Sequence, residues 1–170
     1  MANRLFAAVL MQVVIALIAV TPSFGQGGRG GGGMMGDPSH MADMQLFHQL
    51  FEHRTEITRM VIPRADGIET VTESKNAEVT RLLQAHVASM LARLKEQRPI
   101  HQRDPLFVEL FKHADQIVVT HERTAGGVRI VETSTDAYVV KLLHAHAEVV
   151  SAFLANGMAE MKKNHPLPPR

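Results

Sequence analysis

The chain of 170 residues contains no cysteine and no tryptophan, and aromatic residues make up only 5% of it. Without cysteine, disulfide bonds, thiolate metal sites and covalent c-type haem attachment are excluded, so a packed core must stabilise the fold. The net charge of +1 is nearly neutral, and acidic and basic residues are interspersed. Neither nucleic acid nor an anionic membrane surface is therefore indicated as a partner.

The sequence also lacks the common catalytic motifs. It contains no G-x-S-x-G, no H-E-x-x-H and no glycine loop of the phosphate-binding type between a strand and a helix. Glu69, Glu73 and Glu132 are candidates for acid–base groups on predicted strands, yet their spacing predicts no catalytic pair. An enzyme of unrecognised type stays an alternative without a positive signal.

One apolar run stands out, at the N-terminus. Leu5–Val20 is interrupted only by Gln12 and follows the basic Arg4, and Ser23-Phe24-Gly25 offers small residues for a cleavage site. The run of 16 residues is short for a membrane span, which needs roughly 20. We expect residues 1–25 to be a signal peptide, which predicts a periplasmic or secreted protein without a stable membrane span after cleavage. A retained anchor is the alternative.

Glycine dominates the next segment, residues 26–36, at a density that cannot bury a core. We expect a disordered linker here, followed by a single domain over residues 37–165 and an extended tail over 166–170. Asp37-Pro38 and Asp104-Pro105 each pair an N-cap residue with a proline suited to the first helical position, so both predict helix starts.

An internal repeat organises the predicted domain. Leu46–Leu94 and Leu106–Leu154 align without a gap, with Leu46 on Leu106 and Leu94 on Leu154. Identical residues recur along the whole alignment, among them Phe47/Phe107, Leu50/Leu110, His53/His113, Gly67/Gly127, Ser74/Ser134, Leu83/Leu143 and His86/His146. A repeat of this kind decides the fold, because each copy is one supersecondary unit.

Each copy has the pattern helix, hairpin, helix. The first copy predicts a helix over Pro38–His53, strands over Glu56–Ile62 and Ile68–Glu73, and a helix capped by Asn76; the second predicts strands over Gln116–Glu122 and Val128–Thr133 and a helix from Asp136 to Asn156. One such unit is marginal alone. We therefore predict an α+β domain in which a duplicated αββα unit forms a pseudo-twofold, four-stranded antiparallel sheet covered by helices.

His86 and His146 occupy equivalent positions on the apolar stripes of the two long helices. One interpretation is a core histidine that is hydrogen-bonded to a backbone carbonyl or to a hairpin side chain such as Thr70 or Glu132. Another is that the two rings meet across the pseudo-twofold axis and ligate a metal ion or haem iron. A third is that they line a pocket for another ligand.

His53 and His113 are the other repeated pair, at the ends of the first helices. Histidine in a last turn can bond free carbonyl groups and is favoured by the helix dipole. Alternatively, His53 joins His86 and His113 joins His146, which would give two equivalent ligand sites.

The first predicted helix carries a feature that the second copy lacks. His40, Met44 and His48 are spaced four residues apart and so share one helix face. Thioether and imidazole together suit copper, whereas methionine on an amphipathic helix also serves simply to fill a core. His101, His121 and His165 are expected at the surface or in loops, with no role.

Three segments, TVTESKNAEVTRLLQAHVASMLARL, PIHQRDPLF and YVVKLLHAHAEVV, resemble a family of exported proteins from Gram-negative bacteria to which no activity is assigned. The resemblance covers most of Met41–Pro168 and implies an envelope location, without site residues. We predict an exported, non-catalytic ligand-binding protein. Its candidate ligand is a transition metal, such as copper, or haem, held by His86 and His146 with help from His53, His113 or the helix that carries His40, Met44 and His48. A module that binds another envelope protein is the main alternative.

Overall fold

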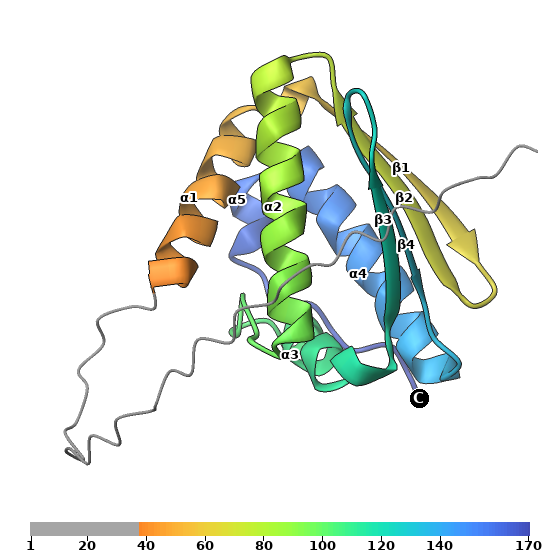
Figure 1. Cartoon of the computed structure of the whole chain (residues 1–170). Helices are drawn as coiled ribbons and strands as arrows, with labels where there is room; N and C mark the ends of the chain where they lie inside the picture. Colours follow the sequence, from red (N-terminus) through yellow and green to blue (C-terminus); the bar gives the residue numbers. More distant parts are fainter. Residues whose placement is uncertain (1–37) are drawn as a thin grey trace, which may run out of the picture. The chain divides into compact units, whose positions relative to one another are not determined.

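A computed structural model describes residues 38–170, which belong to one compact unit (Figure 1). The predicted signal peptide and glycine-rich linker lie outside the described residues. The elements, in chain order, are α1 (Pro38–Glu52), η1 (Arg54–Glu56), β1 (Ile57–Arg64), β2 (Gly67–Ser74), α2 (Ala77–Lys95), α3 (Pro105–Lys112), η2 (Ala114–Gln116), β3 (Val118–Arg123), β4 (Gly127–Thr133), α4 (Ala137–Asn156) and α5 (Met158–Met161).

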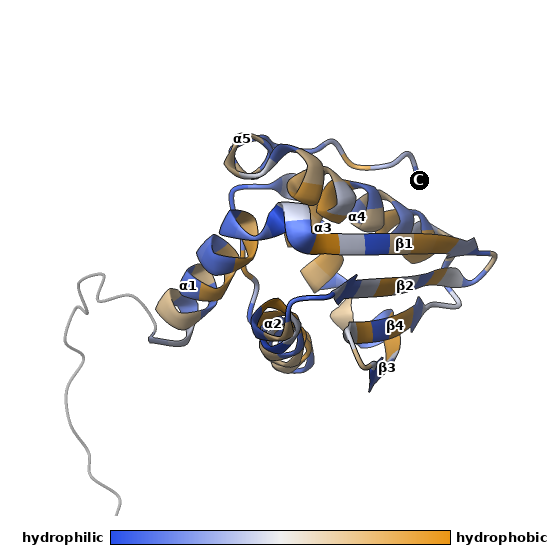
Figure 2. Ribbon diagram, turned by 90° about the horizontal axis from the view of Figure 1, so that it is seen from above, coloured by the Kyte–Doolittle hydropathy of each residue, from blue (hydrophilic) through white to orange (hydrophobic). Residues whose placement is uncertain are grey.

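The four strands form one antiparallel sheet in the order β1-β2-β4-β3, which Figure 2 shows from above. The predicted α+β class with a four-stranded antiparallel sheet is therefore confirmed. Pro63 lies on the edge strand β1, where its missing N–H leaves no gap in the interior of the sheet. On β2, alternate side chains from Ile68 to Ser74 are buried, so one face of the sheet packs against helices.

Helix starts follow the predicted capping residues. Asn76, Asp104 and Asp136 each accept a hydrogen bond from a backbone N–H of the first turn that follows, which satisfies one of the donors left free at a helix start. Ser74 and Ser134 also serve the caps, because each accepts a hydrogen bond from the backbone N–H two residues on.

The central strand pairing is symmetric with respect to the repeat. Gly67 pairs with Thr133 and Glu73 with Gly127, while Thr70 pairs with its own equivalent, Ile130. An axis relating the halves therefore passes through the Thr70–Ile130 pair. The element order of the two halves is also the same, although an ancestral duplication itself stays a prediction from the sequence.

The long helices cross over to the opposite half. α2 packs on β4 as well as β2, whereas α4 packs on β2 and β1. Equivalent side chains secure this crossing: Gln84 donates to the Gly127 carbonyl at 3.1 Å, and His144 Nε2 donates to the Gly67 carbonyl at 2.7 Å. Each long helix thereby covers strands of the opposite half, and the region between the sheet and α2 and α4 lies at the centre of the described domain.

α4 forms much of the core. Its Leu142 and Leu143 are fully buried in a cluster that also contains Ile68, Leu106 and Phe153. Among the described residues, α4 is the one helix long and apolar enough to cross a membrane by length and composition. Its buried residues pack against α3 and the sheet.

The structure differs from the expected element boundaries at the start of each hairpin. Short 3₁₀ turns, η1 and η2, separate the first helix of each half from its strand, so β3 begins at Val118 rather than Gln116. The tail beyond His165 has no regular secondary structure. It contacts the body of the protein, since the Arg170 guanidinium stacks over the Tyr138 ring at 4.6 Å.

Candidate functional site

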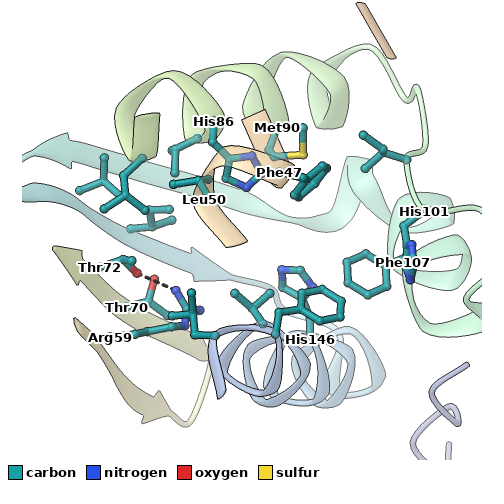
Figure 3. A pocket seen from close by; sticks show the side chains of 18 of the residues that line it. Phe47, Leu50, Arg59, Thr70, Thr72, His86, Met90, His101, Phe107 and His146 are labelled. Carbon is teal, nitrogen blue, oxygen red and sulfur yellow. Dashed lines mark hydrogen bonds between the residues drawn. The ribbon is translucent and has the colours of Figure 1, made fainter. Parts of the chain in front are cut away.

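A cavity of about 210 Å³ lies between the sheet and the helices (Figure 3). Its lining comes from five helices, three strands and the loop before α3, and includes Phe47, Leu50 and Phe51 from α1, Leu83, His86 and Met90 from α2, Phe107, Leu110 and Phe111 from α3, and His146, Val150 and Phe153 from α4. Most of these side chains are apolar, so the cavity presents few polar groups, each at a defined position.

Ten residues of the helical part of the lining form five equivalent pairs. The pairs that occupy matching positions of the repeat and face the cavity are Phe47 and Phe107, Leu50 and Leu110, Phe51 and Phe111, His86 and His146, and Leu94 and Leu154. The pseudo-twofold axis through the central strand pair thus runs through the cavity. This placement explains why the two copies share these side chains: both copies build the same wall.

Each cavity histidine packs edge-to-face against a phenylalanine of its own half. The ring centroids are 4.8 Å apart for Phe47 and His86 and 5.3 Å apart for Phe107 and His146. Such contacts fix ring orientation. Figure 3 shows His86 on the α2 wall and His146 on the α4 wall, with both rings directed into the cavity.

Neither imidazole makes a hydrogen bond to any part of the chain that the structure describes, and Nδ1 of both rings is shielded from solvent. The bond to Thr70 or Glu132 that a purely structural role predicted is therefore not formed. Burial lowers the pKa of His86 to about 4, and burial, with Arg59 and His86 nearby, lowers that of His146 to about 4. Both rings are neutral at pH 7, and each can accept or donate a hydrogen bond, or bind a metal.

The sheet contributes the other polar groups. Arg59 of β1 donates from Nη1 to Thr72 Oγ1 at 2.8 Å, the dashed line in Figure 3, while its Nε is buried without a partner. Glu132 of β4 faces the same cavity. Burial raises the pKa of Glu132 to about 7, although the Arg59 charge opposes the rise. A half-buried guanidinium and a carboxyl that is partly protonated at neutral pH thus share the floor.

No family model, curated protein or solved structure matches this chain. The evidence for a function is therefore the chemistry of the cavity itself.

His101 also lines the cavity, although no sequence pattern singled it out. Its ring packs edge-to-face on Phe107 and Phe153, with centroids 5.0 and 6.1 Å apart. Its backbone φ of 56° lies in the left-handed region, which is uncommon for residues other than glycine. His101 belongs to a loop, without helical or strand periodicity, and its equivalent in the first copy, Met41, lies outside the aligned repeat. Its place in a loop agrees with the expectation from the sequence, whereas its contact with the cavity was not expected.

His165 also lies outside regular secondary structure, as expected of a loop residue, but its side chain is largely buried. Its Nδ1 lies 2.5 Å from Asp104 Oδ2 and its Nε2 lies 3.0 Å from Glu160 Oε1. Asp104 is fully buried and also caps α3. His165 therefore joins the C-terminal segment to the start of α3, outside the cavity lining.

The structure places His53 and His113 away from the cavity lining. His53 Nδ1 lies 2.6 Å from Glu56 Oε1, and this bond raises the pKa of His53. His113 is the C-cap residue of α3, and its Nδ1 accepts from Gln116 Nε2 at 3.1 Å. They do not join His86 and His146. The two rings bond to the side chains of Glu56 and Gln116 rather than to free carbonyl groups at the helix ends.

The three predicted copper ligands of α1, His40, Met44 and His48, also lie outside the lining. α1 presents Phe47, Leu50 and Phe51 to the cavity instead. Within residues 38–170, no three histidine or acidic side chains are grouped so as to hold a metal ion. His40 and His48 are thus left as two imidazoles on a helix face, with no third ligand from histidine, aspartate or glutamate of the described residues.

Proposed function

We propose that this protein binds a small, mostly apolar molecule in the central cavity, with His86 and His146 bonded to polar groups of the ligand. The observation that carries the proposal is the pair of equivalent imidazoles, each directed into one cavity and each without a hydrogen-bond partner in the described chain. A buried polar atom without a partner costs about 1–3 kcal/mol. Two such atoms at equivalent positions call for a partner that the chain does not supply.

The size and lining of the cavity support an organic ligand. An apolar cavity of about 150 Å³ is enough to hold benzene, so a volume of about 210 Å³ accommodates a single ring with a substituent or a short alkyl chain. A porphyrin is several times larger than one ring, so haem would require the helices to move apart. An apolar lining with a few convergent polar groups is the usual composition of a ligand site.

The test is a binding titration of the folded protein with benzyl alcohol, 1-hexanol, benzoate and hexanoate, in which binding is measured by NMR and by calorimetry. We expect saturable binding, with the largest shifts at methyl groups of the lining, such as Leu83, Leu110 and Val150. Val150→Phe should fill the cavity and abolish binding while the protein stays folded. The same change at Val118, which is 64% exposed on β3, is the matched control and should leave binding intact.

The role of the histidines has its own comparison. In a His86→Gln/His146→Gln variant, benzyl alcohol should bind about three- to tenfold more weakly, because hydrogen bonds of about 1 kcal/mol are altered. Benzene, which has no polar group, should bind as before. If none of the probes binds, or if Val150→Phe leaves their binding unchanged, the cavity is not the ligand site and the proposal is wrong.

A second candidate ligand is a soft metal ion such as copper, and one observation favours it. His86 and Met90, one helical turn apart on α2, both line the cavity, and imidazole and thioether suit copper. Elemental analysis of the purified protein and a titration with cuprous ion under reducing conditions test this candidate. Binding that is lost in His86→Gln and in Met90→Leu would support it. An empty result, together with no Soret band after haem addition, would exclude both metal and haem.

The proposed location is the periplasm or the exterior of the cell. Its support is the apolar run Leu5–Val20 and the small residues before Gln26. Fractionation of cells that express the full chain tests it. Recovery of a shortened protein beginning near Gln26 with a periplasmic marker is expected, and a full-length protein in the cytoplasm would refute it.

A further inference from the structure

The floor of the cavity differs between the two halves, whereas the helical walls share five identical pairs. Arg59, Thr70 and Thr72 line the cavity from the first half. Their equivalents in the second copy are Val119, Ile130 and Glu132. The paired histidines and phenylalanines would hold a ligand equally well in two orientations related by the pseudo-twofold axis. The floor distinguishes these orientations, because the first half has the cation Arg59 where the second half has Val119. A bound molecule is therefore oriented by the floor.

Arg59 is the dominant polar group of this floor. Its Nη1 is fixed by the hydrogen bond to Thr72 Oγ1, and its buried Nε has no partner. No carboxylate of the described residues forms an ion pair or hydrogen bond with it. A guanidinium whose Nε makes no hydrogen bond keeps two parallel N–H donors, from Nε and Nη2, which match the two oxygens of a carboxylate.

Glu132 lies in the same cavity without bonding to Arg59. The two come from β4 and β1, which are separated by β2, and no hydrogen bond or ion pair joins them in the described part of the chain. If Glu132 were the intended partner of Arg59, a direct ion pair would be expected, because a buried charge without a partner is costly. Each of the two groups is left to meet a ligand.

From this asymmetry we infer that the ligand is a small organic acid, whose carboxylate binds the Nε edge of Arg59 and whose apolar body lies between the phenylalanine and histidine walls. The inference rests on the proposed function and specifies the chemical class of its ligand. A single carboxylate is favoured over two, because a second negative charge would meet the carboxyl of Glu132 rather than another cation.

The test compares ligands that differ only in the acid group. Hexanoate and 1-hexanol, and benzoate and benzyl alcohol, are titrated at pH 6.0 into the same folded protein by calorimetry. We expect each acid to bind at least about tenfold more tightly than its alcohol, as a charge-assisted, bidentate contact implies. In Arg59→Gln the acid and the alcohol should bind equally, and binding of the alcohol should be unchanged.

Arg64→Gln is the matched control, because Arg64 lies on the same strand but is exposed and pairs with Asp66. It should keep the full preference for the acid. Arg59→Lys serves as a second variant if Arg59→Gln does not fold. It keeps the charge without the planar pair of donors and should retain only part of the preference.

The outcomes distinguish the organic-acid inference from the proposed function. Equal binding of acid and alcohol to the unaltered protein would overturn the organic-acid inference while leaving the apolar cavity as a binding site. A preference for the acid that survives in both Arg59 variants would also overturn it, since another cation would then be responsible. If neither acids nor alcohols bind, the proposed function itself fails.

Discussion

Two neutral imidazoles in a mostly apolar cavity make the protein sensitive to acid. His86 and His146 have pKa values lowered to about 4 by burial, whereas an unfolded histidine titrates near 6.5. Between these values the unfolded chain binds protons that the folded chain does not, so the free energy of unfolding falls as pH drops from 6.5 to 4. The loss would be about 3 kcal/mol for one fully shifted ring.

This acid sensitivity can be tested by removing the titrating groups. His86→Gln/His146→Gln keeps a polar side chain at both positions and should lose most of the decline in stability between pH 6.5 and 4. Urea unfolding at pH 7.0, 5.5 and 4.5, in the absence of ligand, measures the effect. His48→Gln, a change at an exposed histidine of α1, is the control. If the double variant declined as steeply as the unaltered protein, another group would be responsible for acid unfolding.

Glu132 predicts the opposite trend at higher pH. Burial raises its pKa to about 7, so the folded protein holds a proton that the unfolded chain has released. The associated stability is complete below pH 4.5 and is lost as pH rises through 7. Relative to Glu132→Gln, the unaltered protein should therefore lose about 2 kcal/mol of unfolding free energy between pH 5 and 8. Glu122→Gln, at an exposed glutamate of β3, should show no such difference.

The repeat identified His86 and His146 because identity between the copies selects positions that both halves need. The same criterion could not find Arg59, since its equivalent is Val119. It also could not find His101, which lies in a connection rather than in the aligned repeat. Identity between the copies thus predicts the residues that both halves contribute to the cavity. It cannot predict the groups proposed to orient a ligand, because the copies differ at those positions.

At the scale of the elements, two glycines allow a close backbone approach in the sheet. A Cβ at Gly127 would lie 2.0 Å from the Thr72 carbonyl oxygen, and one at Gly67 would lie 1.9 Å from that of Glu132. Gly127→Ala should separate β2 from β4 and destabilise the protein by about 3 kcal/mol or more. Thermal unfolding measures the loss.

The adjacent Gly126 is the matched control for that substitution. A Cβ there would meet its nearest atom, the Ser74 carbonyl oxygen, at 3.1 Å, which a small shift can relieve. Gly126→Ala should therefore destabilise the protein by roughly 1 kcal/mol or less. Equal losses for the two variants would show that glycine is needed for the turn rather than for the close approach of the strands.

Local signals predicted most elements well. The caps Asn76, Asp104 and Asp136 mark helix starts, and Gly157 ends α4, because capping depends on residues that are adjacent in sequence. The 3₁₀ turns η1 and η2 were missed. Their residues carry no turn signature, and the structure there follows from packing against the long helix of the opposite half, since α4 contacts η1 and α2 contacts η2.

At the scale of the whole molecule, crossing of the long helices creates the cavity. The apolar stripes of α2 and α4 predict that both helices cover the sheet, but periodicity does not say which hairpin each one covers. That choice follows from long-range contacts such as Gln84 to Gly127 and His144 to Gly67. Periodicity was therefore enough to predict the covered sheet. The position of a shared cavity on the axis could be seen only in the structure.

The C-terminal segment is attached to this body by a contact that depends on pH. Burial alone would lower the pKa of His165, but its hydrogen bonds to Asp104 and Glu160 raise it above 6.5. A raised pKa means that the folded protein binds the proton more tightly than the unfolded chain. The stability gained is therefore complete below pH 6.5 and is lost as pH rises through the folded value.

Mild alkaline conditions should accordingly loosen the segment from His165 to Arg170 while the sheet stays folded. Hydrogen exchange at the backbone N–H of His165, which is bonded to Asp104 Oδ1 at 3.1 Å, should be slow at pH 6 and faster at pH 8.5 after correction for the intrinsic rate. In His165→Gln, which can still donate one hydrogen bond but cannot carry a charge, corrected exchange should be fast at both pH values. Asp104 also caps α3, which carries Phe107 of the cavity wall, so release of the segment should disturb that wall. Ligand affinity should therefore weaken over the same pH range, and only in the unaltered protein. Exchange that does not change with pH would mean that the segment is held by the contacts of Lys141 and Arg170 rather than by His165.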